Sequence, residues 1–191
     1  MAYQTYITEA IVCGSIDSNT SNRSYYLFTR EAGMVFAHAQ SVREERSKHR
    51  YSLQVCSHAR VTLVRGKSGW RITGAEPIQN FYTHAESRSA RALARAVPLL
   101  LTRFVHGETA HPVIFDDVIY ACMQSNTEDP AHLESILTLR VLYVLGYIAP
   151  DSIVTPFVSS ALQEAIRLTL DARIEKHIKQ MILHAHTESH L

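Results

Sequence analysis

The chain has 191 residues, of which 46% are hydrophobic, so it can bury a real core and wholesale disorder is excluded. No apolar run approaches the roughly 20 residues that a membrane helix needs. The N-terminal residues lack the charged start and apolar centre of a secretory signal, so we expect a cytoplasmic protein. Cys13, Cys56 and Cys122 lie far apart, which argues against a disulfide framework and against a cysteine zinc site.

The net charge of +1 hides an asymmetry between the two parts of the chain. Residues 1–104 carry 14 Lys and Arg against 7 Asp and Glu, whereas residues 105–191 carry 5 against 11. Such segregation favours a first part that binds a polyanion and a second part with another task. The alternative is chance, with the charges simply solvated on the surface.

Residues 25–40, YYLFTREAGMVFAHAQ, predict a β-hairpin, because Gly33 can close a short turn at positive φ. After the turn Val35, Ala37 and Ala39 alternate with other side chains, and this period of two gives a strand two different faces. The small face suits the tight interior of a small barrel. A loop dense in charge follows the hairpin.

Three further stretches predict strands: residues 3–15, residues 51–64 and a last strand that begins at Trp70 and that Gly74 and Pro77 end. With the hairpin this makes five short strands, and no helix large enough to separate them lies between. Such an arrangement indicates a small closed barrel, of which the OB-fold is the commonest five-stranded form. An SH3-like barrel and a sandwich are the alternatives.

Beyond the last strand the apolar residues fall three and four apart, which predicts helices. The expected helices cover residues 86–105, 113–123, 133–145, 157–170 and 174–183. Pro98 would kink or split the first of them, and Asp129-Pro130 is a good start for the third. The last two can form one continuous helix before a polar, frayed tail. We therefore expect an α+β protein, with an OB-fold barrel over residues 1–80 and an all-helical domain over residues 81–191.

Sequence motifs of common catalytic sites are absent: there is no GxxxxGK[ST], no GxSxG and no HExxH. Asp116 and Asp117 are adjacent, so on a helix they point about 100° apart and fit a solvated helix start. His184, His186 and His190 lie in the tail, whereas a metal site needs rigidly held ligands. We expect no catalytic residue, no metal and no cofactor, and a hydrolase is poorly supported.

Nucleic-acid binding is better supported, because phosphate oxygens need cations along a track and loops at one end of a barrel can supply them. The expected phosphate contacts lie in the charged loop and around the last hairpin turn: Arg43, Arg46, Lys48, Arg50, Arg65, Lys67 and Arg71. Glu44 and Glu45 dilute the charge of that loop. A protein-interaction module with little or no DNA binding is therefore the alternative function.

Other side chains could extend such a surface. Tyr25, Tyr26, Phe36 and Trp70 can stack on unpaired bases, although packing in the barrel is the commoner role of such aromatics. Arg88, Arg91 and Arg95 share one face of a predicted helix. They either extend the cationic track or pair with acidic residues of the helical part.

Five segments are distinctive and follow one another along the chain: TEAIV at 8–12, YYLFTREAGMV at 25–35, WRITGAEPI at 70–78, VHGETAHPVIFDDV at 105–118 and LTLRVLYVLGYIAP at 137–150. In this order they resemble the RecO family of recombination mediators. The first three resemble the amino-terminal OB domain of that family, and the last two resemble its helical part.

The resemblance implies a protein that is not an enzyme. RecO-like proteins bind single- and double-stranded DNA at the nucleoid and anneal complementary strands. They act with RecR and with the carboxyl-terminal tail of the single-strand-binding protein SSB, and so help RecA to load on SSB-coated strands. Many members carry a four-cysteine zinc site where this chain has residues 151–161, which contain no cysteine, so we expect no structural zinc. Compared with longer members, we expect this chain to be short at its carboxyl end.

Overall fold

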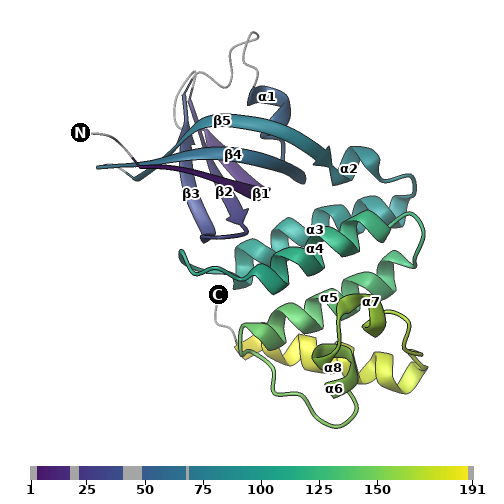
Figure 1. Cartoon of the computed structure of the whole chain (residues 1–191). Coiled ribbons are helices and arrows are strands. Elements are labelled where there is room, and N and C mark those ends of the chain that lie inside the picture. The colour runs from purple at the N-terminus through teal and green to yellow at the C-terminus, as the bar shows by residue number, and fades with distance from the viewer. Residues whose placement is uncertain (1–3, 18–21, 41–48, 68, 189–191) are drawn as a thin grey trace.

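The structure is a computed structural model that describes residues 4–17, 22–40, 49–67 and 69–188. Its strands are β1 (Thr5–Asp17), β2 (Arg23–Thr29), β3 (Gly33–Ala39), β4 (Ser57–Gly66) and β5 (Gly69–Asn80), with the short helix α1 (His49–Ser52) before β4. They close into a barrel in the order β1-β2-β3-β5-β4, with only the β3–β5 pair parallel (Figure 1). The expected five strands followed by helices are confirmed.

The predicted hairpin is confirmed as β2 and β3. Gly33 opens β3 with a φ of 66°, and Val35, Ala37 and Ala39 point into the barrel, where they are buried. A Cβ on Gly33 would overlap the backbone of Thr109, so glycine is needed for close approach as well as for the turn. The β2–β3 turn is thereby held against the loop over residues 105–111.

The prediction of a strand over residues 51–64 is wrong in its first half. The chain forms α1 there, turns through Cys56 at a φ of 70°, and enters β4 only at Ser57. Leu53 is buried among the side chains of the barrel interior, so the alternating apolar residues cover one end of the barrel rather than forming a strand. Period-two spacing over so few residues does not separate these two outcomes.

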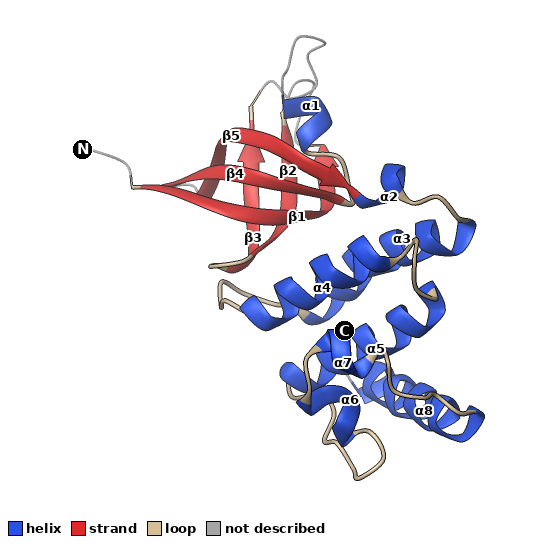
Figure 2. Ribbon diagram, turned by 45° about the vertical axis from the view of Figure 1, so that its right-hand side comes forward, coloured by secondary structure: helices blue, strands red, loops and turns tan. Residues whose placement is uncertain are grey.

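The last strand is longer than expected, because Gly74 and Pro77 do not end it. β5 continues to Asn80, and its register against β4 shifts at two places, between Thr62 and Leu63 and between His58 and Ala59. Such irregularities bend a strand and accommodate residues that a regular ladder excludes. The bent β5 and its neighbours curve around the barrel (Figure 2).

Helices make up the rest of the described chain. They are α2 (Phe81–His84), α3 (Arg88–Phe104), α4 (Pro112–Gln124), α5 (Pro130–Val144), α6 (Thr155–Ser159), α7 (Leu162–Ala165) and α8 (Ala172–Glu188). α3 and α4 lie directly below the barrel, and α5 and α8 lie further below (Figure 1). Pro98 lies inside α3 without splitting it, and the predicted start of α5 is confirmed, because the carboxylate of Asp129 caps it by accepting from the Ala131 N–H.

The predicted helix over residues 174–183 is confirmed within α8, whereas the predicted helix over residues 157–170, and its continuation into 174–183, are wrong. Two short helices, α6 and α7, are separated by extended Ser160. α8 begins after Asp171, whose carboxylate accepts hydrogen bonds from the N–H groups of Arg173 and Ile174. It continues to Glu188, through residues that we expected to be frayed.

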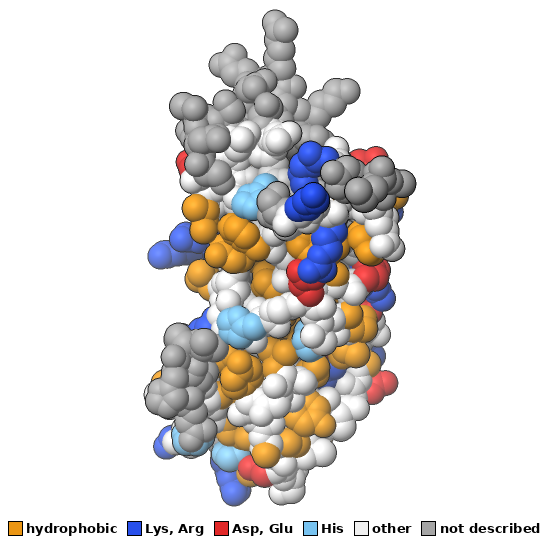
Figure 3. Space-filling view, turned by 90° about the vertical axis from the view of Figure 1, so that its left-hand side faces the viewer, with side chains coloured by type: hydrophobic (Ala, Val, Ile, Leu, Met, Phe, Trp, Pro, Cys, Tyr) orange, Lys and Arg blue, Asp and Glu red, His pale blue; other side chains and the backbone are white. Residues whose placement is uncertain are grey.

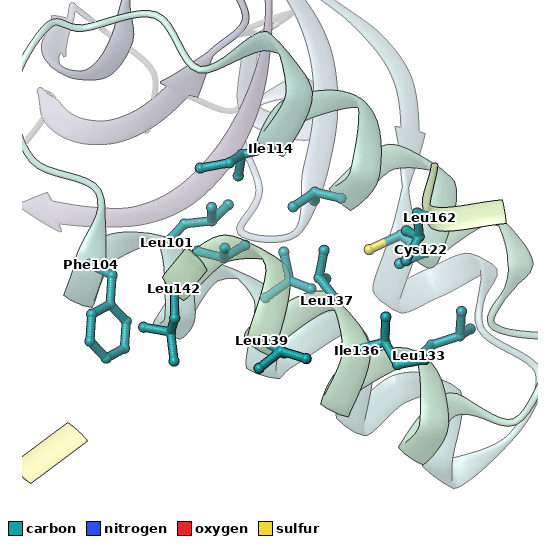
Figure 4. Close-up of a cluster of buried hydrophobic side chains, with 14 of the residues drawn as sticks. Leu101, Phe104, Ile114, Cys122, Leu133, Ile136, Leu137, Leu139, Leu142 and Leu162 are labelled. Carbon is teal, nitrogen blue, oxygen red and sulfur yellow. The ribbon is translucent and has the colours of Figure 1, made fainter. Parts of the chain in front are cut away.

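Two apolar clusters hold the molecule together. One fills the barrel, and the other runs through the helices and reaches the base of the barrel, where Phe28 of β2 lies 5.8 Å from Phe115 of α4 between ring centroids. Leucines of α3 and α5, with Ile114 and Cys122 of α4, line the middle of the second cluster (Figure 4). Because the second cluster includes barrel residues, the barrel and helices share buried apolar surface.

Polar contacts also join the barrel to the helices. Arg30, in the β2–β3 turn, forms a two-pronged ion pair with Asp116 of α4, with Nη2 to Oδ2 at 3.0 Å. The Met34 N–H donates to the carbonyl of Gly107 at 3.0 Å. His58 of β4 stacks on Phe81 of α2, and within the barrel it binds the carboxylate of Glu9 of β1 at 2.8 Å. These contacts fix the end of the barrel that faces α3 and α4.

Candidate nucleic-acid interface

Among the described residues, the helices cover the outer face of β2 and β3 at one end only. On the outer face of β2 and β3 the paired residues are Phe28 with Met34, Tyr26 with Phe36, and Ser24 with His38. Phe28 is covered by the helices, whereas Phe36 is 41% exposed. The outer face therefore changes from a helix-packing surface to a solvent-facing surface along the length of one hairpin.

Two of the predicted phosphate contacts meet beside this open surface. β3 and β5 pair in parallel, and the pairing places Arg71 opposite His38. Lys67 and Arg71 are exposed and line one hollow of about 580 Å³, together with His38, Gln40 and Trp70. Lys and Arg side chains gather over the barrel on the face shown in Figure 3, next to hydrophobic and histidine side chains. Polar and apolar atoms line the hollow in about equal measure, and it has two cations at its wall.

Arg65 lies near the same hairpin but has an acidic partner. Its Nη1 lies 2.7 Å from Oε2 of Glu108, and its guanidinium lies 5.1 Å from the ring centroid of Trp70. The other oxygen of Glu108 accepts from the Trp70 indole N–H at 2.9 Å. Glu108 thus ties the β4–β5 hairpin to the α3–α4 loop and neutralises much of the charge of Arg65 locally.

Burial decides which predicted aromatics can meet a base. Trp70 is 7% exposed and Tyr25 is 1% exposed, so for both residues packing in the barrel, the commoner role of such aromatics, is confirmed and stacking on a base is not available. Phe36 and the partly exposed Tyr26 remain on the outer face. The alternation of side chains along a strand could have distinguished the buried Tyr25 from the outward-facing Tyr26, because neighbouring residues of one strand point to opposite faces.

The side chains of the other four predicted phosphate contacts lie outside the part of the chain that the structure describes. Arg43, Arg46 and Lys48 lie outside the described residues. Arg50 lies in α1, and its side chain is also outside the described part. The structure therefore brings together Arg65, Lys67 and Arg71 around one hairpin, and it leaves the contribution of the charged loop as a prediction.

Arg88, Arg91 and Arg95 are exposed on one face of α3, as expected. Among the described side chains none of the three forms an ion pair. Arg95 is close enough to Cys56 to lower the pKa of its thiol, against the larger effect of burial, which raises it. Arg95 therefore lies near the turn that follows α1.

The interpretation of Asp117 as part of a solvated helix start is wrong. Asp117 is 9% exposed, and its Oδ2 accepts from Nε of Arg140 at 2.7 Å. Nη1 of Arg140 also donates to the carbonyls of Phe157 at 2.9 Å and Ser160 at 2.6 Å. Burial raises the pKa of Asp117, and the guanidinium of Arg140 offsets only part of that rise. The pair joins α4 and α5 to the segment around α6.

The cysteines have the properties of structural residues. Burial raises the pKa of the Cys13 thiol to about 12 and that of Cys56 to about 11, and it raises the pKa of Cys122 as well. Such thiols stay protonated at neutral pH and are poor nucleophiles. Within the part of the chain that the structure describes, no three His, Cys, Asp or Glu side chains are grouped as metal ligands.

The helical part has a hollow of its own. It measures about 440 Å³ and lies between α3, α5 and α8, with Leu100, Leu137 and Ile182 in its wall and Arg103 at its edge. Its lining is mostly apolar. Glu134 also lines it, and burial raises the pKa of this carboxyl.

None of the described helices is both long enough and apolar enough to span a bilayer.

Comparison with known proteins identifies the first part of the chain. Residues 1–81 match the family described as "Recombination protein O N terminal". The DNA repair protein RecO of Dehalococcoides mccartyi strain CBDB1 is 32% identical over 141 residues, which are 73% of this chain and 56% of the relative. RecO of Desulfitobacterium hafniense strain DSM 10664 / DCB-2 is 28% identical over 142 residues, 74% of this chain and 52% of the relative.

A third relative, the DNA repair protein RecO of Heliobacterium modesticaldum, is 31% identical over 114 residues, 51% of this chain and 42% of the relative. The chain thus spans about half the length of the curated relatives it matches. The similarity runs through the barrel into the helices, as the five segments in the sequence indicated. On these matches the chain belongs to the RecO family of DNA repair proteins.

Proposed function

We propose that this chain binds DNA through the phosphate backbone, without reading sequence, as part of recombinational repair. The observation that carries the proposal is the exposure of Lys67 and Arg71 in one hollow between β3 and β5. Cations held on neighbouring elements can neutralise successive phosphates and release their counterions. Family membership supports a role in DNA repair.

The barrel itself supports the proposal, because we assign it to the OB-fold. Five strands in the order β1-β2-β3-β5-β4, closed by one parallel pair, form a small Greek-key barrel of the kind that binds oligonucleotides on its β2–β3 face and adjoining loops. We propose residues 1–80 as this domain and residues 81–191 as the helical domain. The change from β5 to α2 after Asn80 supports that division.

The phosphate contacts that we propose include the charged loop as well as the hollow. Arg43, Arg46, Lys48 and Arg50 follow β3 directly in the sequence, and β3 forms one side of the hollow. Arg65 is a weaker candidate, because a phosphate must compete with Glu108 for its guanidinium.

We further propose that the chain binds single and double strands, anneals complementary strands, and acts with RecR and the tail of SSB so that RecA loads on SSB-coated DNA. Screening of phosphate charge reduces the repulsion between two strands and so permits pairing. This work needs no bond-breaking residue and no cofactor. It would take place on the nucleoid in the cytoplasm.

A protein-interaction module is the second candidate function. The apolar hollow between α3, α5 and α8 favours it, because concave apolar surfaces suit a partner's apolar side chains. The ion pair of Arg65 with Glu108 favours it as well, since that pair reduces the positive charge at the hairpin. In this case the barrel would hold little or no DNA.

A fluorescence-anisotropy titration with labelled oligonucleotides separates the two candidates. We expect the double variant Lys67→Glu/Arg71→Glu to bind at least about tenfold more weakly in low salt, because two phosphate contacts become repulsive. The matched control is Arg167→Glu/Arg173→Glu, which changes the net charge equally at exposed positions of the helical part. Equal losses in both variants, or no binding by the unchanged chain, would contradict the proposal.

A further inference from the structure

Three side chains on the open outer face of the barrel form a ladder of rings. The centroids of Tyr26 and Phe36 lie 4.8 Å apart with an interplanar angle of 47°, and those of Phe36 and His38 lie 5.5 Å apart at 78°. We name these three residues the ring ladder. Its members come from adjacent strands and alternate positions, so it is a product of strand pairing and not of the local sequence alone.

Backbone and side-chain contacts hold the ladder in place. Tyr26 pairs with Gly14 of β1, and a Cβ at that glycine would lie 3.5 Å from the Tyr26 ring, so the ring lies close over the glycine. At the other end Nδ1 of His38 lies 2.7 Å from Oγ of Ser24. Phe36 stands between these two anchored rings and is 41% exposed. The ladder therefore presents a pre-positioned phenyl ring to solvent.

The ladder borders the cationic hollow described above. His38 belongs to both, and the parallel register of β3 and β5 places Arg71 beside it. Across the outer face the two aromatic rings of the ladder are thus followed by the imidazole of His38 and then by the guanidinium of Arg71. A surface for an unpaired nucleic-acid strand needs this combination, with rings that stack on bases and cations along the adjoining backbone. A duplex keeps its base faces stacked on each other and cannot use such rings.

We propose that the ring ladder is a stacking site for unpaired bases, with Phe36 as the principal ring and with Lys67 and Arg71 holding the phosphates of the same strand. The proposal rests on the proposed function and deepens it, because it assigns single-stranded DNA to this face. Duplex DNA then meets only the cations. The consequence is a preference for single strands that disappears when Phe36 loses its ring.

The test uses three labelled probes of equal length: an oligo-dT strand, a strand of abasic sites with the same phosphates, and a duplex. Anisotropy titrations compare the unchanged chain with Phe36→Ala, with Phe36→Trp and with Tyr82→Ala. Tyr82 is the matched control, because it is 40% exposed and lies on α2, outside the ladder. A strand carrying 2-aminopurine reports stacking directly through quenching of its fluorescence.

We expect Phe36→Ala to bind oligo-dT roughly 5- to 150-fold more weakly, the range that loss of one stacked base gives. Its affinities for the abasic strand and for the duplex should not change. Phe36→Trp should restore binding and quenching, and Tyr82→Ala should match the unchanged chain. Because Phe36 faces solvent, these substitutions leave the barrel interior intact.

Two results would refute the stacking role of the ring ladder while leaving the proposed function in place. One is equal affinity of the unchanged chain for the abasic strand and for oligo-dT. The other is an affinity of Phe36→Ala for oligo-dT equal to that of Tyr82→Ala. Failure of the unchanged chain to bind any of the three probes would instead refute the proposed function, and the ladder with it.

Discussion

Replacing Arg140 with Met is the sharpest test of the packing of the helical part. Arg140 is 5% exposed, and its guanidinium donates to the Asp117 carboxylate and to the carbonyls of Phe157 and Ser160. Met keeps most of the apolar volume of the side chain but removes all three hydrogen bonds. Asp117 is then left buried without its cation.

The expected cost is about 3–5 kcal/mol in the free energy of unfolding, the range for removing one partner of a buried ion pair. For a chain of this size that corresponds to a fall in Tm of roughly 6–20 °C. The double variant Arg140→Met/Asp117→Leu should lose much less than the sum of the two single variants, because no uncompensated charge remains. Urea unfolding followed by circular dichroism gives each value.

The deficit of Arg140→Met also depends on pH. Burial raises the pKa of Asp117 above its ordinary value of 3.8, so the native state binds this proton more tightly than the unfolded chain. Without Arg140 the pKa rises further. The free energy of unfolding of the variant is therefore furthest below that of the unchanged chain at neutral pH. This difference decreases as the pH falls and Asp117 becomes protonated.

The control is Arg167→Met, at an exposed position of the same half, which should change stability by less than about 0.5 kcal/mol. A loss below about 1 kcal/mol for Arg140→Met, or a deficit that grows in acid, would refute the reasoning. Either result would show that the Asp117 carboxylate finds another partner or reaches water when Arg140 is replaced.

Two further substitutions and one titration test other contacts. Gly33→Ala places a Cβ against the α3–α4 loop at positive φ, so the Tm should fall by the equivalent of about 2 kcal/mol or more; an unchanged Tm would contradict this close approach. Glu108→Gln keeps an acceptor for the Trp70 indole but frees Arg65, so DNA binding should tighten and its salt dependence should steepen by up to about 1 in log–log slope; weaker binding would speak against it. Backbone N–H donors, followed by a histidine of α8, lower the pKa of Asp151, so its stabilising effect is present at neutral pH and is lost as the pH falls through the folded value. An NMR titration should find the pKa of this carboxyl below 3.8, and a value above 3.8 would contradict the hydrogen bonds from the Ile153 and Val154 N–H groups.

The sequence predicted the elements whose causes are local. Gly33 between two alternating strands defined the hairpin, and the small residues Val35, Ala37 and Ala39 correctly indicated the barrel interior. Asp129 followed by Pro correctly gave the start of α5. In each case the turn, the cap or the face is determined by residues within a few positions of each other.

Elements that depend on distant partners were misread. Gly74 and Pro77 end a strand in isolation, but β4 accommodates them through shifts in register. Leu53 resembled a strand residue until the barrel end that it fills was known. The break between α7 and α8 did have a local signal, because Asp171 is a good helix cap that periodicity alone overlooks.

The candidate site shows the same division. Charge counts found Lys67 and Arg71, since exposed cations around a turn are visible in sequence. Nothing in the sequence paired Arg65 with Glu108, or Asp117 with Arg140, because those partners are 43 and 23 residues apart. The parallel β3–β5 register, which sets His38 beside Arg71, likewise appears only when the barrel closes.

The dependence of DNA affinity on salt tests the central claim most directly, because it counts the phosphates that the barrel neutralises. For single-stranded DNA between about 50 and 200 mM salt, three or more contacts predict a slope of log K against log salt of about −2 or steeper. The variant Lys67→Ala/Arg71→Ala should make that slope shallower by about 1.4. A slope near zero for the unchanged chain, or an unaltered slope in the variant, would contradict a DNA surface at this end of the barrel.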